Sequence, residues 1–258
     1  MKPRSDNTRY AFLLLSALVL ITASGCANGR WARMRRAPLN PLTNSLELDS
    51  WQGPQPTDRT LQMLRRNDLA NMLQREPAET VTAVQEVAYQ EPTADNVYSI
   101  AEVAYIGAKR LEENGNSTRA LDLYATAAAN AYFYLFDSNF DRGRNPYDPR
   151  FRRACDLYNN ALEAGLRFLA RQGKLKPGVT DTIITDEQTF DIQIATRGTW
   201  HEDNFDELKF VSDFKVEELK NVYRTFGLGV PLIAVYKEHN RHAADRFYPP
   251  GMSFPVTA

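Results

Sequence analysis

The stretch ALDLYATAAANAYFYL, which runs from Ala120 to Leu135, has the apolar spacing of a helix with one buried face. A related stretch, ACDLYNNALEAGLRFL, begins 34 positions later at Ala154, and six of the sixteen aligned residues are identical. A further helical pattern from Val97 to Leu111 precedes the first stretch, and only a short polar loop separates the two. A connection this short predicts a hairpin of two antiparallel helices.

The offset between the two stretches is also the period of tetratricopeptide repeats, and the residues resemble that family. Its second-helix signature, Ala-x3-Tyr-x2-Ala, occurs at 120–127 and again at 154–161. Between the copies, Asn145-Pro146 and Asp148-Pro149 disfavour the first helix of a full repeat, because the residue before proline avoids helical dihedral angles. Gly107 stands where that family has a large apolar residue. We therefore predict one hairpin with a related third helix rather than a repeat array.

The pattern changes from helical to β-rich near the middle of the chain. Apolar residues alternate with polar ones at 190–194, and an apolar strand is expected at 232–236 and another at 252–258. The predicted fold class is α+β, with an α-helical region over 57–172 followed by a β-rich region over 173–258. The last apolar segment has no closing turn, so we expect the β-rich region to be the start of a larger, incomplete domain.

The N-terminus has the pattern of a secretory signal. Lys2, Arg4 and Arg9 precede a mostly apolar run at 10–23. That run is shorter than the roughly 20 residues that a membrane-spanning helix needs, but it suits the apolar segment of a signal peptide. We predict a signal peptide over 1–25.

Three small residues, Ala23, Ser24 and Gly25, lead into Cys26 and resemble the lipobox of bacterial lipoproteins, although that family usually has Leu where Ala23 stands. The resemblance implies cleavage before Cys26 and attachment of a diacylglyceryl group to its thiol. Cleavage by an ordinary signal peptidase and an uncleaved anchor are the alternatives. Ala27 occupies the position where Asp would indicate retention at the inner membrane, so the resemblance favours an outer-membrane lipoprotein that faces the periplasm.

Residues 26–56 are rich in proline and predict an extended, lipid-anchored tether. Several arginines and one tryptophan follow the cysteine. They are expected either to contact anionic lipid headgroups or to form a solvated basic linker. These residues are Arg30, Trp31, Arg33, Arg35 and Arg36.

Composition excludes some classes of protein. The chain has 258 residues, of which 31 are Lys or Arg and 32 are Asp or Glu. The resulting net charge of −1 gives no reason to expect a nucleic-acid partner. Two cysteines cannot form a disulfide framework, and Cys155 is expected to be a small buried apolar residue.

No catalytic residue, metal site or cofactor is predicted within the chain. Residues 251–255 approach the G-x-S-x-G pattern of a nucleophilic serine but lack the final glycine. His201 is isolated, and His239 and His242 have no accompanying Cys or carboxylate motif, so surface positions are expected. The glycines at 227–229 lead into a strand, whereas a phosphate-binding loop leads into a helix.

The aromatic side chains of 124–136 could line a ligand groove. At helical spacing they are expected in the core instead, with Phe133 or Tyr134 facing a neighbouring domain.

Several phrases along the chain together resemble the N-terminal region of large bacterial lipoproteins, of planctomycete and proteobacterial type, that are predicted as α/β-hydrolases. These phrases are RTLQMLRRNDLA from Arg59, AEVAYIGAKR from Ala101, ALDLYATAAANAY from Ala120, YDPRFRRACDLYNNAL from Tyr147, YRTFGLGVPLIAVY from Tyr223 and YPPGMSFPVTA from Tyr248. The resemblance covers most of 57–258. It implies that the catalytic serine, acid and histidine lie beyond this chain.

Two functions are therefore expected for this chain. The first is a lipid-anchored bacterial envelope protein that forms the N-terminal part of a serine-esterase-like α/β-hydrolase. The alternative is a non-enzymatic envelope scaffold whose tetratricopeptide-like hairpin binds a partner protein.

Overall fold

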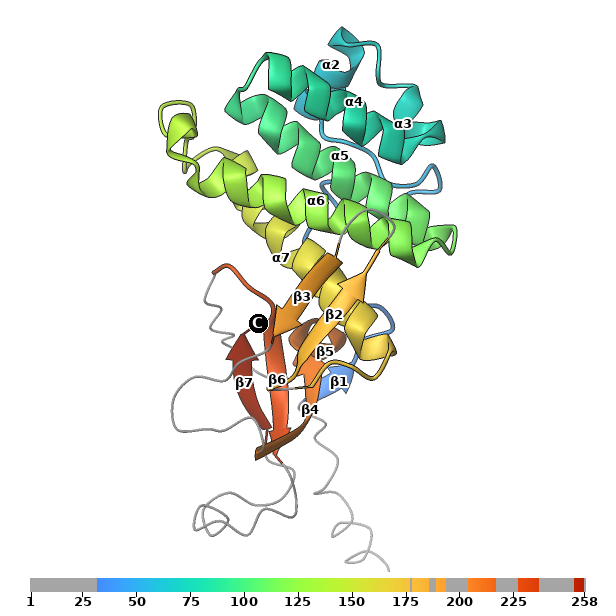
Figure 1. Cartoon of the computed structure of the whole chain (residues 1–258), viewed down its shortest axis with the longest axis vertical. Helices are drawn as coiled ribbons and strands as arrows, with labels where there is room; N and C mark the ends of the chain where they lie inside the picture. The colour runs from blue at the N-terminus through green and yellow to red at the C-terminus, as the bar shows by residue number, and fades with distance from the viewer. Residues whose placement is uncertain are drawn as a thin grey trace, which may run out of the picture.

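The computed structural model describes residues 32–176, 178–185, 189–193, 204–216, 227–236 and 253–257. Helices form the first part of this chain and antiparallel strands the second, which confirms the predicted α+β class. In Figure 1 the helices lie in the upper half, and α7 runs down from them beside the strands. The α-helices are α2 (Asp58–Arg66), α3 (Met72–Arg75), α4 (Pro77–Gln90), α5 (Ala94–Glu113), α6 (Ser117–Phe136) and α7 (Pro149–Arg171).

Each helix from α4 to α7 packs against the next one along the chain, and consecutive helices alternate in direction (Figure 1). The predicted hairpin is α5 and α6. Thr93 opens α5, because its side chain accepts a hydrogen bond from the Asn96 N–H at 3.2 Å. Asn116 caps α6, where Ser117 or Thr118 would have been expected from sequence preferences.

The segment between α6 and α7 confirms that the full repeat is absent. Only a single 3-10 turn, η1 (Ser138–Phe140), interrupts residues 137–148. Pro149 is instead the first residue of α7, a position that does not require its missing N–H, and Asp148 accepts a hydrogen bond from the Arg150 N–H at 2.9 Å. Gly107 lies where α4, α5 and α6 come together, since a Cβ atom there would lie 2.9 Å from Leu123 Cδ1. The helices therefore pack too closely at Gly107 for the large residue of the tetratricopeptide pattern.

The strands form three small antiparallel sheets, β1–β5, β2–β3 and β4–β6–β7. Strands β3, β6 and β7 were predicted by apolar pattern, whereas β1 and β2 were not. The strands are β1 (Ala32–Met34), β2 (Thr180–Ile184), β3 (Thr189–Gln193), β4 (Phe205–Phe210), β5 (Phe214–Val216), β6 (Pro231–Tyr236) and β7 (Ser253–Thr257), with the 3-10 turn η3 (Val211–Asp213) between β4 and β5.

Helix α7 joins the helices to the strands. Its residues Leu166 and Leu169 belong to a second apolar cluster, which also contains the buried side chains of β4 and β6. Polar contacts lie beside this cluster. The guanidinium of Arg167 donates to Asp213 Oδ1 at 2.7 Å, and its central carbon lies 4.2 Å from the centre of the Phe210 ring. Helix α6 also contacts the β-rich region, because Leu121 belongs to the same apolar cluster and Asp122 accepts a hydrogen bond from the Thr185 hydroxyl.

The structure corrects the predicted tether over 26–56, as far as it describes that segment. Ala32–Met34 pairs with β5, and Leu42 and Leu46 are fully buried in the main helical core. The Pro54 carbonyl also accepts a hydrogen bond from Arg110 Nη2 at 2.6 Å. Strand pairing, two buried leucines and a hydrogen bond to Arg110 therefore hold this proline-rich segment on the fold.

Among the helices that the structure describes, none combines the length and the apolar character needed to cross a bilayer.

Candidate binding site

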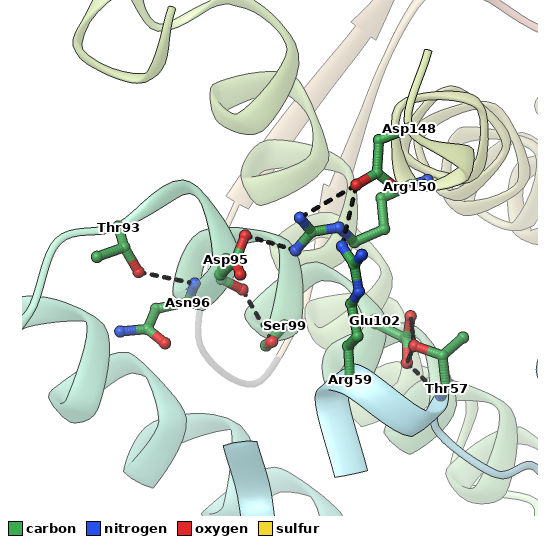
Figure 2. Close-up of polar contacts among 9 residues, drawn as sticks. All are labelled: Thr57, Arg59, Thr93, Asp95, Asn96, Ser99, Glu102, Asp148 and Arg150. Atoms are coloured by element: carbon green, nitrogen blue, oxygen red, sulfur yellow. Dashed lines mark hydrogen bonds and ion pairs between the residues drawn. The ribbon is translucent and has the colours of Figure 1, made fainter. Parts of the chain in front are cut away.

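The candidate site is a polar cluster where the start of α2, the middle of α5 and the start of α7 meet (Figure 2). Glu102 of α5 is fully buried at its centre. One of its carboxylate oxygens accepts hydrogen bonds from the Thr57 N–H at 2.6 Å and from Thr57 Oγ1 at 2.9 Å. Because Thr57 is the residue immediately before α2, these bonds fix the start of α2 against α5.

A second part of the cluster is a chain of ion pairs. Figure 2 shows the guanidiniums of Arg59 and Arg150 converging on Asp148. Arg59 Nη1 lies 3.0 Å and Arg150 Nη2 lies 3.4 Å from Asp148 Oδ2, and Arg150 also pairs with Asp95. The cluster therefore ties α2, α5 and α7 together.

The environment of these groups shifts their protonation. The hydrogen bond from the Arg150 backbone N–H lowers the pKa of Asp148, and the guanidiniums of Arg150 and Arg59 lower it further. Desolvation acts to lower the pKa of Arg150, but Asp95 and Asp148 outweigh it and raise that pKa. Asp148 is thus held as a carboxylate and Arg150 as a cation.

A pocket of about 360 Å³ opens beside this cluster. Its wall combines cationic, acidic and hydroxyl groups, with Arg153 from α7 on one side and residues 45–59 on the other. The Nε atom of Arg153 is buried and has no hydrogen-bond partner in the described part of the chain. The lining residues are Ser45, Glu47, Pro56, Thr57, Asp58, Arg59 and Arg153.

Two buried hydroxyls of the same helices, Thr60 Oγ1 of α2 and Tyr98 Oη of α5, make no hydrogen bond of normal geometry with the described residues. Burial raises the pKa of Tyr98 far above its ordinary range, and the charge of Glu102 adds to that shift, while the positive charge of Arg153 opposes it. Tyr98 therefore stays a neutral donor at physiological pH.

The two hydroxyl side chains in the wall of the pocket are engaged in hydrogen bonds. The hydroxyl of Ser45 donates to the Leu42 carbonyl at 3.2 Å, and that of Thr57 donates to Glu102. None of the side chains that line the pocket is a histidine or cysteine. No group of three or more metal-ligating side chains occurs among the residues that the structure describes.

Most of the residues singled out from sequence lie outside the described residues. These are Ala23, Ser24, Gly25 and Cys26, then Arg30 and Trp31, and the histidines His201, His239 and His242. Their roles stay predictions.

The other three basic residues of the N-terminal cluster are described. Arg35 donates from Nε to the Phe214 carbonyl at 3.2 Å, and its N–H donates to the Asp213 carbonyl at 2.7 Å. Arg33 and Arg36 are exposed. These three arginines therefore lie on the folded part of the protein.

The predicted aromatic core is only partly correct. Tyr124 and Tyr134 are buried, as expected. Tyr132, Phe133 and Phe136 are about half exposed, and the rings of Tyr132 and Phe136 lie 4.8 Å apart. Cys155 packs against the helical core, where burial raises the pKa of its thiol.

The pocket itself was missed by sequence reasoning. Its residues come from two segments about a hundred positions apart, so no local spacing connects them. The buried glutamate at Glu102, within an otherwise apolar helix face, was the one signal in the sequence that could have pointed to it.

Comparisons of the chain with protein-family models, with curated proteins and with solved structures found no significant match.

Proposed function

We propose that this protein is a lipid-anchored envelope protein whose helices support the sheet of a larger, serine-esterase-like α/β-hydrolase domain. The observation that carries the proposal is the character of β6, which is apolar on both of its faces. The catalytic residues would lie beyond this chain, as the sequence resemblance implies.

Apolar residues occupy successive positions along β6, from Leu232 to Val235. Leu232 and Ala234 are buried and belong to the cluster that includes Leu166 and Leu169 of α7. Because successive side chains of a strand point to opposite faces, Ile233 and Val235 lie on the face away from that cluster.

A sheet that is covered on one side only usually has polar residues on its other side. The second apolar face of β6 is typical of a strand inside a larger domain that is covered on both faces. Its order in the sheet, between β4 and β7, also makes it a central strand.

The test is to read the coding frame beyond Ala258. A G-x-S-x-G motif should follow, and the extended protein should hydrolyse short-chain nitrophenyl esters. Replacing the serine of that motif by alanine should abolish the activity without changing the circular dichroism spectrum. A reading frame without a nucleophile motif, or an extended protein without esterase activity, would contradict the proposal.

Anchoring through Cys26 is a separate part of the proposal and is supported by the lipobox-like residues Ala23, Ser24 and Gly25. Mass spectrometry of protein extracted from membranes should find a mature N-terminus at Cys26 that carries acyl chains. Cys26→Ala should move the protein out of the outer-membrane fraction. A mature form that begins at another residue would exclude lipidation.

A scaffold role is the second candidate, and the half-exposed aromatic side chains of α6 favour it. Tyr132, Phe133 and Phe136 would anchor an apolar helix of a partner protein, since aromatic side chains dominate such contacts. A photo-crosslinking residue at position 133 should yield one discrete product in the envelope. The same residue at Tyr89, which is exposed on α4, provides the matched control and should yield none. Equal products from both positions, or no product from position 133, would count against this role.

A further inference from the structure

We infer that the pocket beside Arg153 binds a small zwitterion, with a carboxylate held at Arg153 and an ammonium group held at the acidic rim. A free amino acid or a short peptide has this chemistry. The inference does not rest on the hydrolase proposal, because the pocket lies within the helical region.

The pocket is small, and the contacts around it hold its walls in place. Its volume of about 360 Å³ is near the lower end for ligand sites in proteins, so it suits a molecule of a few residues at most. Its walls come from the segment before α2, from the first residues of α2 and from α7, and the Glu102 and Asp148 contacts fix these parts to one another. The pocket is therefore formed before any ligand arrives.

Arg153 is the group in the pocket that would bind the carboxylate of a ligand. Three arginines lie in or near the site, and two of them, Arg59 and Arg150, are engaged by carboxylates. Arg153 differs, because no carboxylate among the described residues forms an ion pair with it, and its Nε is in addition buried without a hydrogen-bond partner there, as is that of Arg150. A guanidinium is always charged and presents paired donors that match a carboxylate.

The start of α2 adds to this preference for an anion. A threonine in this position commonly caps the free N–H groups of the first helical turn. Thr57 makes no such cap, because its hydroxyl is bonded to Glu102. The first-turn N–H groups next to the pocket are thus left without their usual side-chain acceptor, and the helix dipole favours a negative ligand there.

The mixed charge of the pocket lining favours a zwitterion over a ligand that is only negative. Glu47 and Asp58 also line the pocket, and both residues are exposed. Together with Arg59 and Arg153 they give lining side chains with two positive and two negative charges. A phosphate dianion would be repelled by the two carboxylates, whereas a ligand with one charge of each sign is attracted at both ends.

The experiment is calorimetric titration of the full chain in detergent, at neutral pH and low salt, with glycylglycine as the probe. Glycylglycinamide lacks the carboxylate and N-acetylglycylglycine lacks the ammonium group. Each should bind about tenfold more weakly than glycylglycine or worse, because each leaves one end of the site unpaired. This comparison uses only the unaltered protein, so it does not depend on the folding of a variant.

Variants then locate the site. Arg153→Gln should weaken glycylglycine binding by about tenfold. Arg152→Gln is the matched control, since Arg152 is the preceding residue on α7, pairs with Asp156 and does not line the pocket. That control should leave binding unchanged. The double variant Glu47→Gln, Asp58→Asn should weaken glycylglycine but not N-acetylglycylglycine.

Several results would overturn the inference. They are no detectable binding of glycylglycine at millimolar concentrations, tighter binding of inorganic phosphate than of the dipeptide, or equal losses from Arg153→Gln and Arg152→Gln. None of these results bears on esterase activity of an extended chain, so the two proposals fail separately.

Discussion

Removing the guanidinium of Arg167 should loosen the contact between the helices and the sheet. Arg167→Met keeps most of the apolar stem but removes the charge and all of its donors. In the intact protein, Arg167 Nε lies 2.8 Å from Glu163 Oε1 and Nη2 lies 2.7 Å from Asp213 Oδ1. Ser212 Oγ also accepts from Arg167 at 2.9 Å.

The expected loss follows from these contacts. Charge-assisted hydrogen bonds to partly buried carboxylates contribute about 1–3 kcal/mol in total at a site of this exposure. The stacking of the guanidinium on the Phe210 ring contributes about 1 kcal/mol. We therefore expect Arg167→Met to lower the free energy of unfolding by roughly 2–4 kcal/mol. Arg167→Lys is the matched control and should lose about half as much, because lysine keeps the charge but not the planar fork.

Two measurements check this expectation. Urea unfolding followed by circular dichroism gives the change in stability. Amide hydrogen exchange gives its location, since β4 and η3 should exchange faster while α4 and α5 keep their protection. A stability change below about 0.5 kcal/mol, or faster exchange spread evenly over the helices, would refute the view that Arg167 joins the two regions.

Three further changes test other contacts. Glu102→Ala should lower the free energy of unfolding in urea by about 3 kcal/mol, because it leaves the Thr57 N–H and hydroxyl without their acceptor. Glu102→Gln should lower it by only about 1 kcal/mol. Equal losses for the two variants would contradict this. Asp68, just after α2, has a φ of +58°, a backbone conformation that glycine adopts with less strain than other residues. Asp68→Gly should therefore raise the melting temperature by relieving about 1 kcal/mol of backbone strain, whereas Asp68→Ala should lower the melting temperature. Desolvation acts to raise the pKa of Glu112, but Lys109 and the hydrogen bond from Tyr124 outweigh it and lower that pKa. A carboxyl whose pKa is lowered by folding stabilises the protein at pH values above its ordinary pKa, and this stability is lost as the pH falls through the pKa of the folded state. Glu112→Gln should therefore make the loss of stability between about pH 5 and pH 3 less steep. An unchanged loss of stability in acid would contradict this role of Glu112.

The helical half of the fold could be predicted because its information is local. Apolar residues recur at helical spacing through α5 and α6, and Thr93 and Gly115, at the two ends of α5, are residue types that commonly begin and end helices. The proline pairs before α7 likewise act on the dihedral angles of their own neighbours. Each of these signals lies within a few residues of the feature that it predicts.

Features that depend on distant residues could not be found in this way. Strand β1 is three exposed residues long and is a strand only because β5 lies beside it. Leu42 and Leu46 lie among prolines and polar residues that favour an open chain, but the helical core covers them. The pocket depends on Arg153 being brought to Thr57, which follows from the packing of α7 and from no pattern near either residue.

Pairing of β1 with β5 has a consequence for where the protein sits if Cys26 carries the lipid. Ala32, which pairs with Val216 of β5, lies six positions after Cys26. Six residues of fully extended chain span at most about 20 Å. The folded part would then stay close to the bilayer surface, with the exposed Arg33 and Arg36 near the lipid headgroups. With such an anchor, the protein would reach only partners and ligands that lie close to the membrane surface.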